Sequence, residues 1–222
     1  MVAVYVSSAA TGVGTTVTTV PAVIPAGNVG DLMLACAWSN NSTATWTATG
    51  WAGGTMVQGT VPFWRIADGT EGATMNFVRA TNATNPAGVT IARYRNAGPV
   101  HLMQATGQTS GTSTTIALTG VTTTIPGCDL IQIVAKVDAS GAWSPPGTAT
   151  ERFEVNTSGG SGSPTAGGDE VVAAAGATGT RTWTRGATEL GASRGVLIAV
   201  APYRRPAQAR SANPALGRSF NW

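Results

Sequence analysis

Charged side chains are scarce in this chain of 222 residues. Asp, Glu, Lys and Arg together make up 10% of it, against about 25% in typical soluble domains. A surface with so few charges suits a protein that is covered in its working state, as in fibres and shells, better than a freely diffusing enzyme. The thirteen cations exceed the ten acids by only three, and they are spread along the chain, so we expect no nucleic-acid partner.

Histidine and cysteine are almost absent. His101 is the only histidine, and Cys36 and Cys128 are the only cysteines. A Ser or Cys nucleophile needs a nearby base, usually His, and a zinc site needs three or four ligands. Glu151 and Glu154 are expected to point to opposite faces of a strand, whereas glycoside hydrolysis needs two facing carboxylates. We therefore expect no enzyme activity, no cofactor and no metal.

The sequence also lacks a long apolar run. Its start, MVAVYVSSAATG, has neither a basic segment nor an apolar stretch long enough for a signal peptide or a membrane span. We expect synthesis in the cytoplasm and no membrane partner. The two cysteines are too few for a disulfide framework, and each is expected to be a small buried apolar side chain.

The chain contains two similar sequence segments. GDLMLACAW begins at Gly30, and CDLIQIVAKVD begins at Cys128. Similar blocks follow both in the same order, with 97 positions from Trp46 to Trp143 and 106 from Phe77 to Trp183. One insertion, in the Gly- and Ser-rich stretch 158–168, accounts for the change in spacing. The pattern predicts an internal duplication, over about 13–95 and again over about 114–204.

Each repeated block alternates apolar and polar residues as a β-strand does, and turn signals rich in Gly, Pro and Asn separate the blocks. No segment has the 3.6-residue period of a helix. The sequence predicts an all-β protein, an antiparallel β-sandwich (jelly-roll-like) built from two internally duplicated halves. We expect a single domain over 1–204, with the halves sharing strands across one core, and an extended arginine-rich arm over 205–222.

One face of the first copy looks unlike its counterpart. If the copies are aligned on their shared Asp-Leu pair, Leu34 matches Gln132, and Trp38 lies on the same apolar face as Leu34. This alignment predicts that Leu34 and Trp38 dock a neighbouring subunit or the chain's own tail. The alternative is a register slip of one residue, which would swap the two faces.

After the second copy the pattern breaks. RRPAQARSANPALGRSFNW contains two prolines and no acid. We interpret it as a docking arm, in which arginines pair with a partner's carboxylates and aromatic rings fill a pocket; the alternative is a frayed terminus. The docking residues would be Arg204, Arg205, Arg210, Arg218, Phe220 and Trp222.

A second candidate surface lies in the strand TRTWTRG. Arg181, Trp183 and Arg185 share one strand face, and an Arg-Trp-Arg ladder could stack on a sugar, hold an anion or bind a protein through cation–π contacts. The alternative is that Trp183, which matches Phe77, is buried in the core.

Several motifs together resemble a known family. The motifs that carry the resemblance are IPAGNVGDLMLA, FWRIADG, WSPPGTATERFE, GDEVVAAAGATGTRTWT and VLIAVAPYR. The chain resembles the duplicated β-sandwich proteins of actinobacterial tailed phages, prophages and some bacterial surface proteins. The resemblance covers about residues 20–204 and carries no catalytic residues. The TATGW of the first copy and the arginine-rich arm depart from the family pattern.

The resemblance implies a virion structural protein, a minor tail or tail-tip component whose partners are copies of itself and other virion proteins. Two alternatives remain open at this point. One is a capsid decoration protein of the same fold, and the other is an adhesin that binds host cell-wall glycan. Tail and capsid positions are not distinguished by these motifs.

Overall fold

The structure is a computed structural model that describes residues 2–14, 16–80, 85–107, 113–136, 141–156, 163–186 and 192–203. In these ranges the chain forms eighteen strands and no helix. The prediction of an all-β, antiparallel sandwich is confirmed. A helix long and apolar enough to cross a membrane is absent from the described ranges.

The first half of the chain forms two antiparallel sheets. The larger one has the strand order β1-β8-β3-β6-β5, and the smaller one has the order β2-β7-β4. Their bounds are β1 (Val4–Val13), β8 (Ala87–Arg95), β3 (Leu32–Ser39), β6 (Thr60–Ile66), β5 (Ala52–Gly53), β2 (Thr19–Val23), β7 (Thr74–Arg79) and β4 (Trp46–Ala48).

The second half repeats this arrangement. Its larger sheet has the order β9-β18-β12-β15-β14, its smaller sheet has the order β10-β17-β13, and β11 pairs with β16. Their bounds are β9 (Ala97–Gly107), β18 (Ser193–Pro202), β12 (Cys128–Lys136), β15 (Pro164–Val172), β14 (Thr150–Asn156), β10 (Thr115–Leu118), β17 (Arg181–Arg185), β13 (Trp143–Ser144), β11 (Thr122–Thr123) and β16 (Gly176–Ala177).

The two halves share details as well as strand order. The indole N–H of Trp46 donates to the carbonyl of Gly59 at 3.1 Å, and that of Trp143 donates to the carbonyl of Pro164 at 3.3 Å. Both tryptophans are buried. An internal duplication would leave this recurrence, and the duplication itself stays a prediction.

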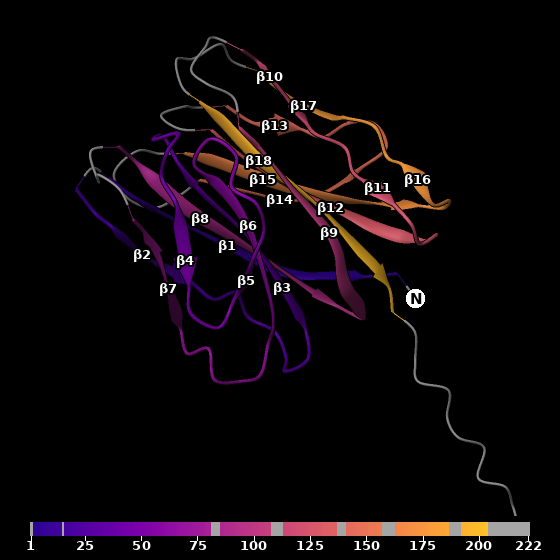
Figure 1. The fold of residues 1–222 in the computed structure, drawn as a ribbon, viewed down its shortest axis with the longest axis horizontal. Helices are drawn as coiled ribbons and strands as arrows, with labels where there is room; N and C mark the ends of the chain where they lie inside the picture. Colours follow the sequence, from indigo (N-terminus) through magenta and orange to yellow (C-terminus); the bar gives the residue numbers. More distant parts are fainter. Residues whose placement is uncertain are drawn as a thin grey trace, which may run out of the picture.

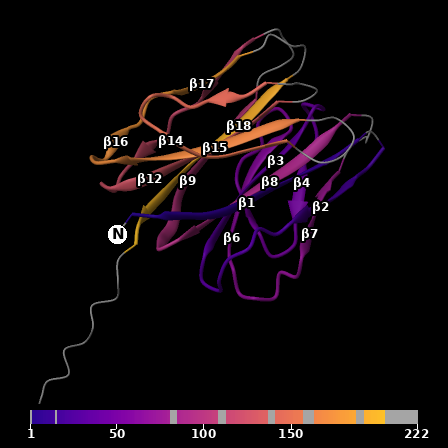
Figure 2. The same ribbon diagram turned by 180° about the vertical axis from the view of Figure 1, so that it is seen from behind.

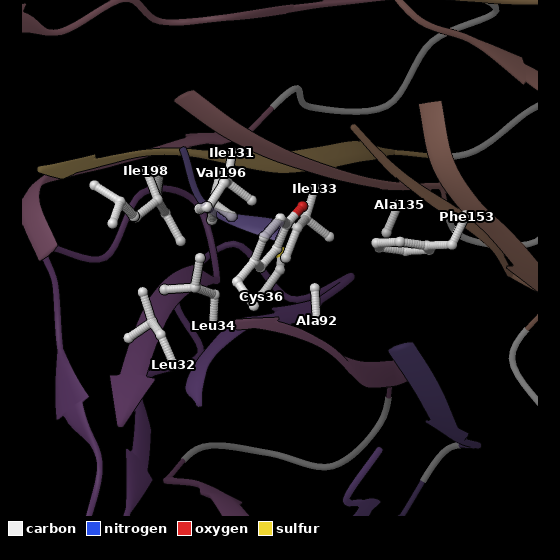
Figure 3. Packing of buried hydrophobic residues seen from close by; sticks show 14 of the residues in the cluster. Leu32, Leu34, Cys36, Ala92, Ile131, Ile133, Ala135, Phe153, Val196 and Ile198 are labelled. Atoms are coloured by element: carbon white, nitrogen blue, oxygen red, sulfur yellow. The ribbon is translucent and has the colours of Figure 1, made fainter. Parts of the chain in front are cut away.

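The four main sheets stack as layers, with the two larger sheets in the middle and the smaller sheets outside (Figures 1 and 2). The larger sheets enclose what we call the central core, in which Leu32 and Leu34 face Val196 and Ile198 (Figure 3). Its buried members include Leu32, Leu34, Cys36, Trp38, Ala92, Tyr94, Ile131, Ile133, Ala135, Phe153, Val196, Ile198 and Val200. A separate buried cluster lies between the larger and the smaller sheet of each half.

This arrangement corrects part of the predicted architecture. Each sheet takes its strands from one half only, so the halves do not share strands as expected. They do share a core, because the central core draws side chains from both larger sheets. The chain crosses from one half to the other through Asn96, which has φ 55° and joins β8 directly to β9; Asn tolerates this left-handed conformation better than most residues.

The predicted docking role of Leu34 and Trp38 is wrong. Both side chains are completely buried in the single chain, because the second half of the same chain covers them in the central core. The error comes from the alignment on Asp-Leu. Leu34 faces the central core together with Ile131, whereas Gln132 points to the other side of its sheet and bonds Trp183, so Leu34 and Gln132 do not occupy matching faces. The alternative of a one-residue slip is confirmed.

Two buried hydrogen bonds also join the halves. The backbone N–H of Ala3 donates to Oδ2 of Asp129 at 2.8 Å, and Nε of Arg194 donates to the carbonyl of Ser39 at 3.3 Å. Burial raises the pKa of the Asp129 carboxyl, because the charged form loses water when the core closes. The same cause raises the pKa of Cys36 to about 12 and lowers that of Arg194 to about 10.

Candidate functional site

The Arg-Trp-Arg ladder of β17 does not face solvent. Trp183 is completely buried, and its indole N–H donates to Oε1 of Gln132 on β12 at 2.8 Å. The strand therefore turns this face inward, toward the larger sheet of its own half. The prediction of a ligand-binding face is wrong, and the alternative that Trp183 matches Phe77 as a core residue is confirmed.

The two arginines of the ladder are also engaged inside the sandwich. Arg181 forms an ion pair with Glu170, and Glu170 accepts a further hydrogen bond from Nε2 of Gln132 at 3.1 Å. Arg185 is buried, and its guanidinium carbon lies 5.4 Å from the centre of the Trp143 ring. The contacts of Trp183 and Arg181 form a polar network that ties the smaller sheet to the larger one, since a buried polar group is costly without partners.

The predicted docking arm cannot be placed on the fold. Arg204, Arg205, Arg210, Arg218, Phe220 and Trp222 all lie outside the described residues. The last described residue before them is Tyr203, which directly follows β18. The position of Tyr203 fixes the point on the body from which segment 204–222 departs.

Tyr203 is part of an apolar groove that the sequence did not reveal. The groove has a volume of about 680 Å³. From the first half it takes Gly30 and the end of β6, Trp64 and Ile66; from the second it takes the start of β9, the end of β18 and Ile125. Trp64 and Ala97 also pack against the central core, so the groove opens beside the place where the two sandwiches meet.

The rim of the groove exposes apolar side chains to solvent. Ile66, a lining residue, is 44% exposed, and Val29, adjacent in sequence to the lining residue Gly30, is 70% exposed. A smaller hollow of about 260 Å³ adjoins the groove through Gly30, Ala97 and Tyr203, and Val29 belongs to its lining. Apolar surface gathered around a concavity is typical of a place where another chain or ligand is bound.

The charges near the groove are compensated or lie beyond its rim. Asp31 lines the smaller hollow, accepts a hydrogen bond from the backbone of Asn28 and lies 3.2 Å from Nε of Arg93 and 3.5 Å from Nε of Arg95. Asp68, two positions after Ile66, is an exposed carboxylate with its pKa lowered to about 2, mainly by hydrogen bonds from Thr70. The groove itself is therefore a surface for apolar groups.

Other reactive groups do not assemble into a catalytic arrangement in the described part of the chain. A bulge in β14 between Glu151 and Phe153 puts Glu151 and Glu154 on the same side of the strand, so their predicted opposite orientation is wrong. Burial, and then repulsion from Glu154, raises the pKa of Glu151, but Glu154 accepts a hydrogen bond from the backbone of Trp143. His101 contacts Thr124.

Cysteine and metal-ligating groups give no further site. Cys36 and Cys128 are both free and buried, which confirms the prediction for them. Within the described residues, no group of three or more His, Cys, Asp and Glu side chains is placed to hold a metal ion.

Comparison with known proteins gives no match for this chain among protein families, curated proteins or solved structures. The resemblance to duplicated β-sandwich proteins of tailed phages therefore rests on the sequence motifs alone.

Proposed function

We propose that this chain is a non-enzymatic structural component of a phage virion, placed on the tail or tail tip. It acts by self-association and by docking to other virion proteins. The family resemblance supports the virion context, and the low charge content supports a protein whose surface is largely covered in its working state.

The observation that carries the docking mechanism is the apolar groove. It combines an apolar lining with the exposed side chain of Ile66, and the hollow that adjoins it exposes Val29. An apolar surface of this kind is stabilised when another chain removes it from water, by about 25 cal/mol for each Å² covered. We assign the groove as the docking surface of the subunit.

The surface that the sequence offered for binding host glycan is not available on this fold. The surface proposed for it was the ladder of Arg181, Trp183 and Arg185, and these side chains face the interior of their own sandwich. Replacement of Trp183 by Ala is therefore expected to destabilise the fold, and loss of glycan binding in that variant would not identify a receptor site.

The proposal is tested on particles released from cells that carry the gene. Purified particles are separated into heads and tails, and the chain is quantified in each fraction by mass spectrometry. We expect it in the tail fraction at a fixed number of copies. Its presence only in the head fraction would indicate a capsid position, and its absence from purified particles would refute the virion function.

The role of the groove is tested by incorporation of variants into the same particles. Ile66→Lys places a charge on the groove and is expected to reduce incorporation at least tenfold. Val78→Lys is the matched control, because Val78 is 39% exposed on β7 of the outer sheet and lies outside the groove lining. Equal incorporation of the two variants would show that the groove is not the docking surface.

A further inference from the structure

We propose that the partner held by the apolar groove is a peptide segment of another virion protein that combines apolar side chains with an acidic one, and that Arg95 binds its carboxylate. This inference rests on the proposed function and deepens it, because it states the chemistry of the partner at the same docking surface. It depends on the smaller hollow of about 260 Å³, which adjoins the groove through Gly30, Ala97 and Tyr203.

The smaller hollow differs from the groove because its wall presents hydrogen-bond donors. Arg95 lines the hollow with a side chain that is 49% exposed. Asn28 and Asn96 also line it, and both are exposed. A guanidinium and the amide of an asparagine can each donate to a carboxylate. Among the described residues that line the groove or the hollow, Asp31 is the only acid, and it is buried.

Positive charge exceeds negative charge by one at the smaller hollow. The guanidinium groups of Arg93 and Arg95 share the single carboxylate of Asp31, with their Nε atoms 3.2 and 3.5 Å from its oxygens. Arg93 is buried, and its terminal nitrogens donate to the backbone carbonyls of Pro25 and Asn28 at 2.9 and 2.7 Å. The excess charge therefore faces solvent at Arg95.

The guanidinium of Arg95 is open to a second carboxylate. Within the described part of the chain, its one charged contact is the 3.5 Å approach to Asp31. A guanidinium binds a carboxylate through two parallel hydrogen bonds. A neutral apolar segment that covered the groove and the hollow would remove water from Arg95 without replacing it, and this costs free energy. The surface therefore favours an acidic segment over a neutral or basic one.

A second copy of the chain matches this surface less well. On the described surface, an exposed large apolar side chain and an exposed acid lie within three positions of each other only at Ile66 and Asp68. Ile66 lines the groove itself, so a second copy would have to offer its own docking surface as the ligand. This favours a segment of another protein.

The inference is tested by selecting displayed random peptides on the immobilised full chain. We expect the peptides that wild type enriches to combine apolar residues with an Asp or a Glu. The tightest of them is then synthesised together with a copy in which the acid is replaced by its amide. Wild type should bind the amide copy at least about fivefold more weakly, whereas Arg95→Gln should bind the two copies equally. Selection on Arg95→Glu should enrich Lys or Arg in place of the acid.

Arg152→Gln is the matched control. Arg152 is 37% exposed on β14 and lines neither the groove nor the smaller hollow, so this variant should keep the preference of wild type for the acidic copy. Ile66→Lys should weaken the binding of both copies at least about tenfold, because it places a charge against the apolar side chains of the peptide. Arg95→Gln is expected to fold, since Asp31 keeps its contact with Arg93.

Three results would overturn the inference. They are an acid preference that persists in Arg95→Gln, a selection that enriches no peptides or peptides without acids, and peptide binding that Ile66→Lys leaves unchanged. Sedimentation of the isolated chain adds a further test. Self-association that Arg95→Gln abolishes would show that the occupant is a second copy and would also overturn the inference.

The test is separable from that of the proposed function. The selection uses isolated protein, so it can fail while the chain is still found in tails and Ile66→Lys still reduces incorporation into particles. In that case the groove remains the docking surface and the acidic partner is wrong. Conversely, a chain that is absent from purified particles refutes the virion function even where Arg95 confers the acid preference.

Discussion

Replacing Leu34 by Ala should destabilise the single chain strongly, because the second half of the same chain buries this side chain. Leu34 has no exposed surface and lies among residues of β12 and β18 (Figure 3). The change removes three carbon atoms at about 0.8 kcal/mol each, and the cavity left behind adds to the loss. The expected cost is about 3 kcal/mol, within the 2–5 kcal/mol range of buried Leu→Ala changes.

The assay is urea unfolding of wild type, Leu34→Ala, Ile198→Ala and the double variant. Because Leu34 and Ile198 belong to the same core, their losses should differ from additivity by at least about 0.5 kcal/mol. Met33→Ala is the matched control: Met33 is equally buried, but it belongs to the cluster between the two sheets of the first half. Its loss should add to that of Ile198→Ala within about 0.5 kcal/mol.

The reasoning fails in either of two cases. Leu34→Ala could cost less than about 1 kcal/mol, or the unfolding midpoint of wild type could rise with protein concentration. The first result would show that Leu34 is not buried within the single chain, and the second would place the covering surface on a neighbouring subunit, one of the two occupants that the alignment on Asp-Leu predicted. A concentration-independent midpoint together with coupling between Leu34 and Ile198 would place it within the chain.

Three further predictions follow from buried contacts. Gln132→Leu leaves the indole N–H of β17 without its acceptor, so unfolding in urea should show a loss of about 1–3 kcal/mol; a loss below about 0.5 kcal/mol would contradict the network. Gly88→Ala sets a Cβ 2.4 Å from the ring of Trp38 and should lower the melting temperature by several degrees. Gly147→Ala is the control, because its Cβ meets nothing within 4 Å, and it should leave the melting temperature unchanged. Burial raises the pKa of Asp129 above 3.8, so the charged form of this side chain costs stability. The free energy of unfolding of wild type should therefore fall relative to that of Asp129→Asn as pH rises from about 4 through the raised pKa. A difference between the two proteins that stays constant from pH 4 to 8 would refute this.

The sequence was sufficient to predict which residues share a face of a strand. Alternation in β12 correctly separated Ile131 and Ile133 from Gln132, because residues two apart on a strand share a face. The regular spacing of Trp46 and Trp143 indicates a structural role, and both are buried.

The relation between the two copies was harder to obtain. Asp31 and Asp129 look equivalent, but Asp31 pairs with Arg93 and Arg95 whereas Asp129 accepts from the backbone of Ala3. Anchoring the alignment on these residues shifted it by one position, and in a strand a shift of one reverses the faces. The spacing of 97 between the matched tryptophans would have given the correct register.

The groove could not be predicted from local patterns. Its walls come from the loop before β3, from β6, from β9, from the loop before β12 and from β18. These segments meet only because the two larger sheets pack face to face, and alternation along a strand does not reveal which sheet covers which. The ladder of β17 was misplaced for the same reason, since periodicity identifies a shared face without showing whether it points inward.

The most direct test of the face-to-face packing uses Cys36 as its own reporter. Cys36 is completely buried in the central core, and burial raises the pKa of its thiol to about 12. In a Cys128→Ser variant at a dilution where the chain is monomeric, we expect labelling of Cys36 by a thiol reagent only at the rate of global unfolding, with the same dependence on urea. Rapid labelling of the native monomer would show that the two sandwiches do not cover each other and would contradict the account.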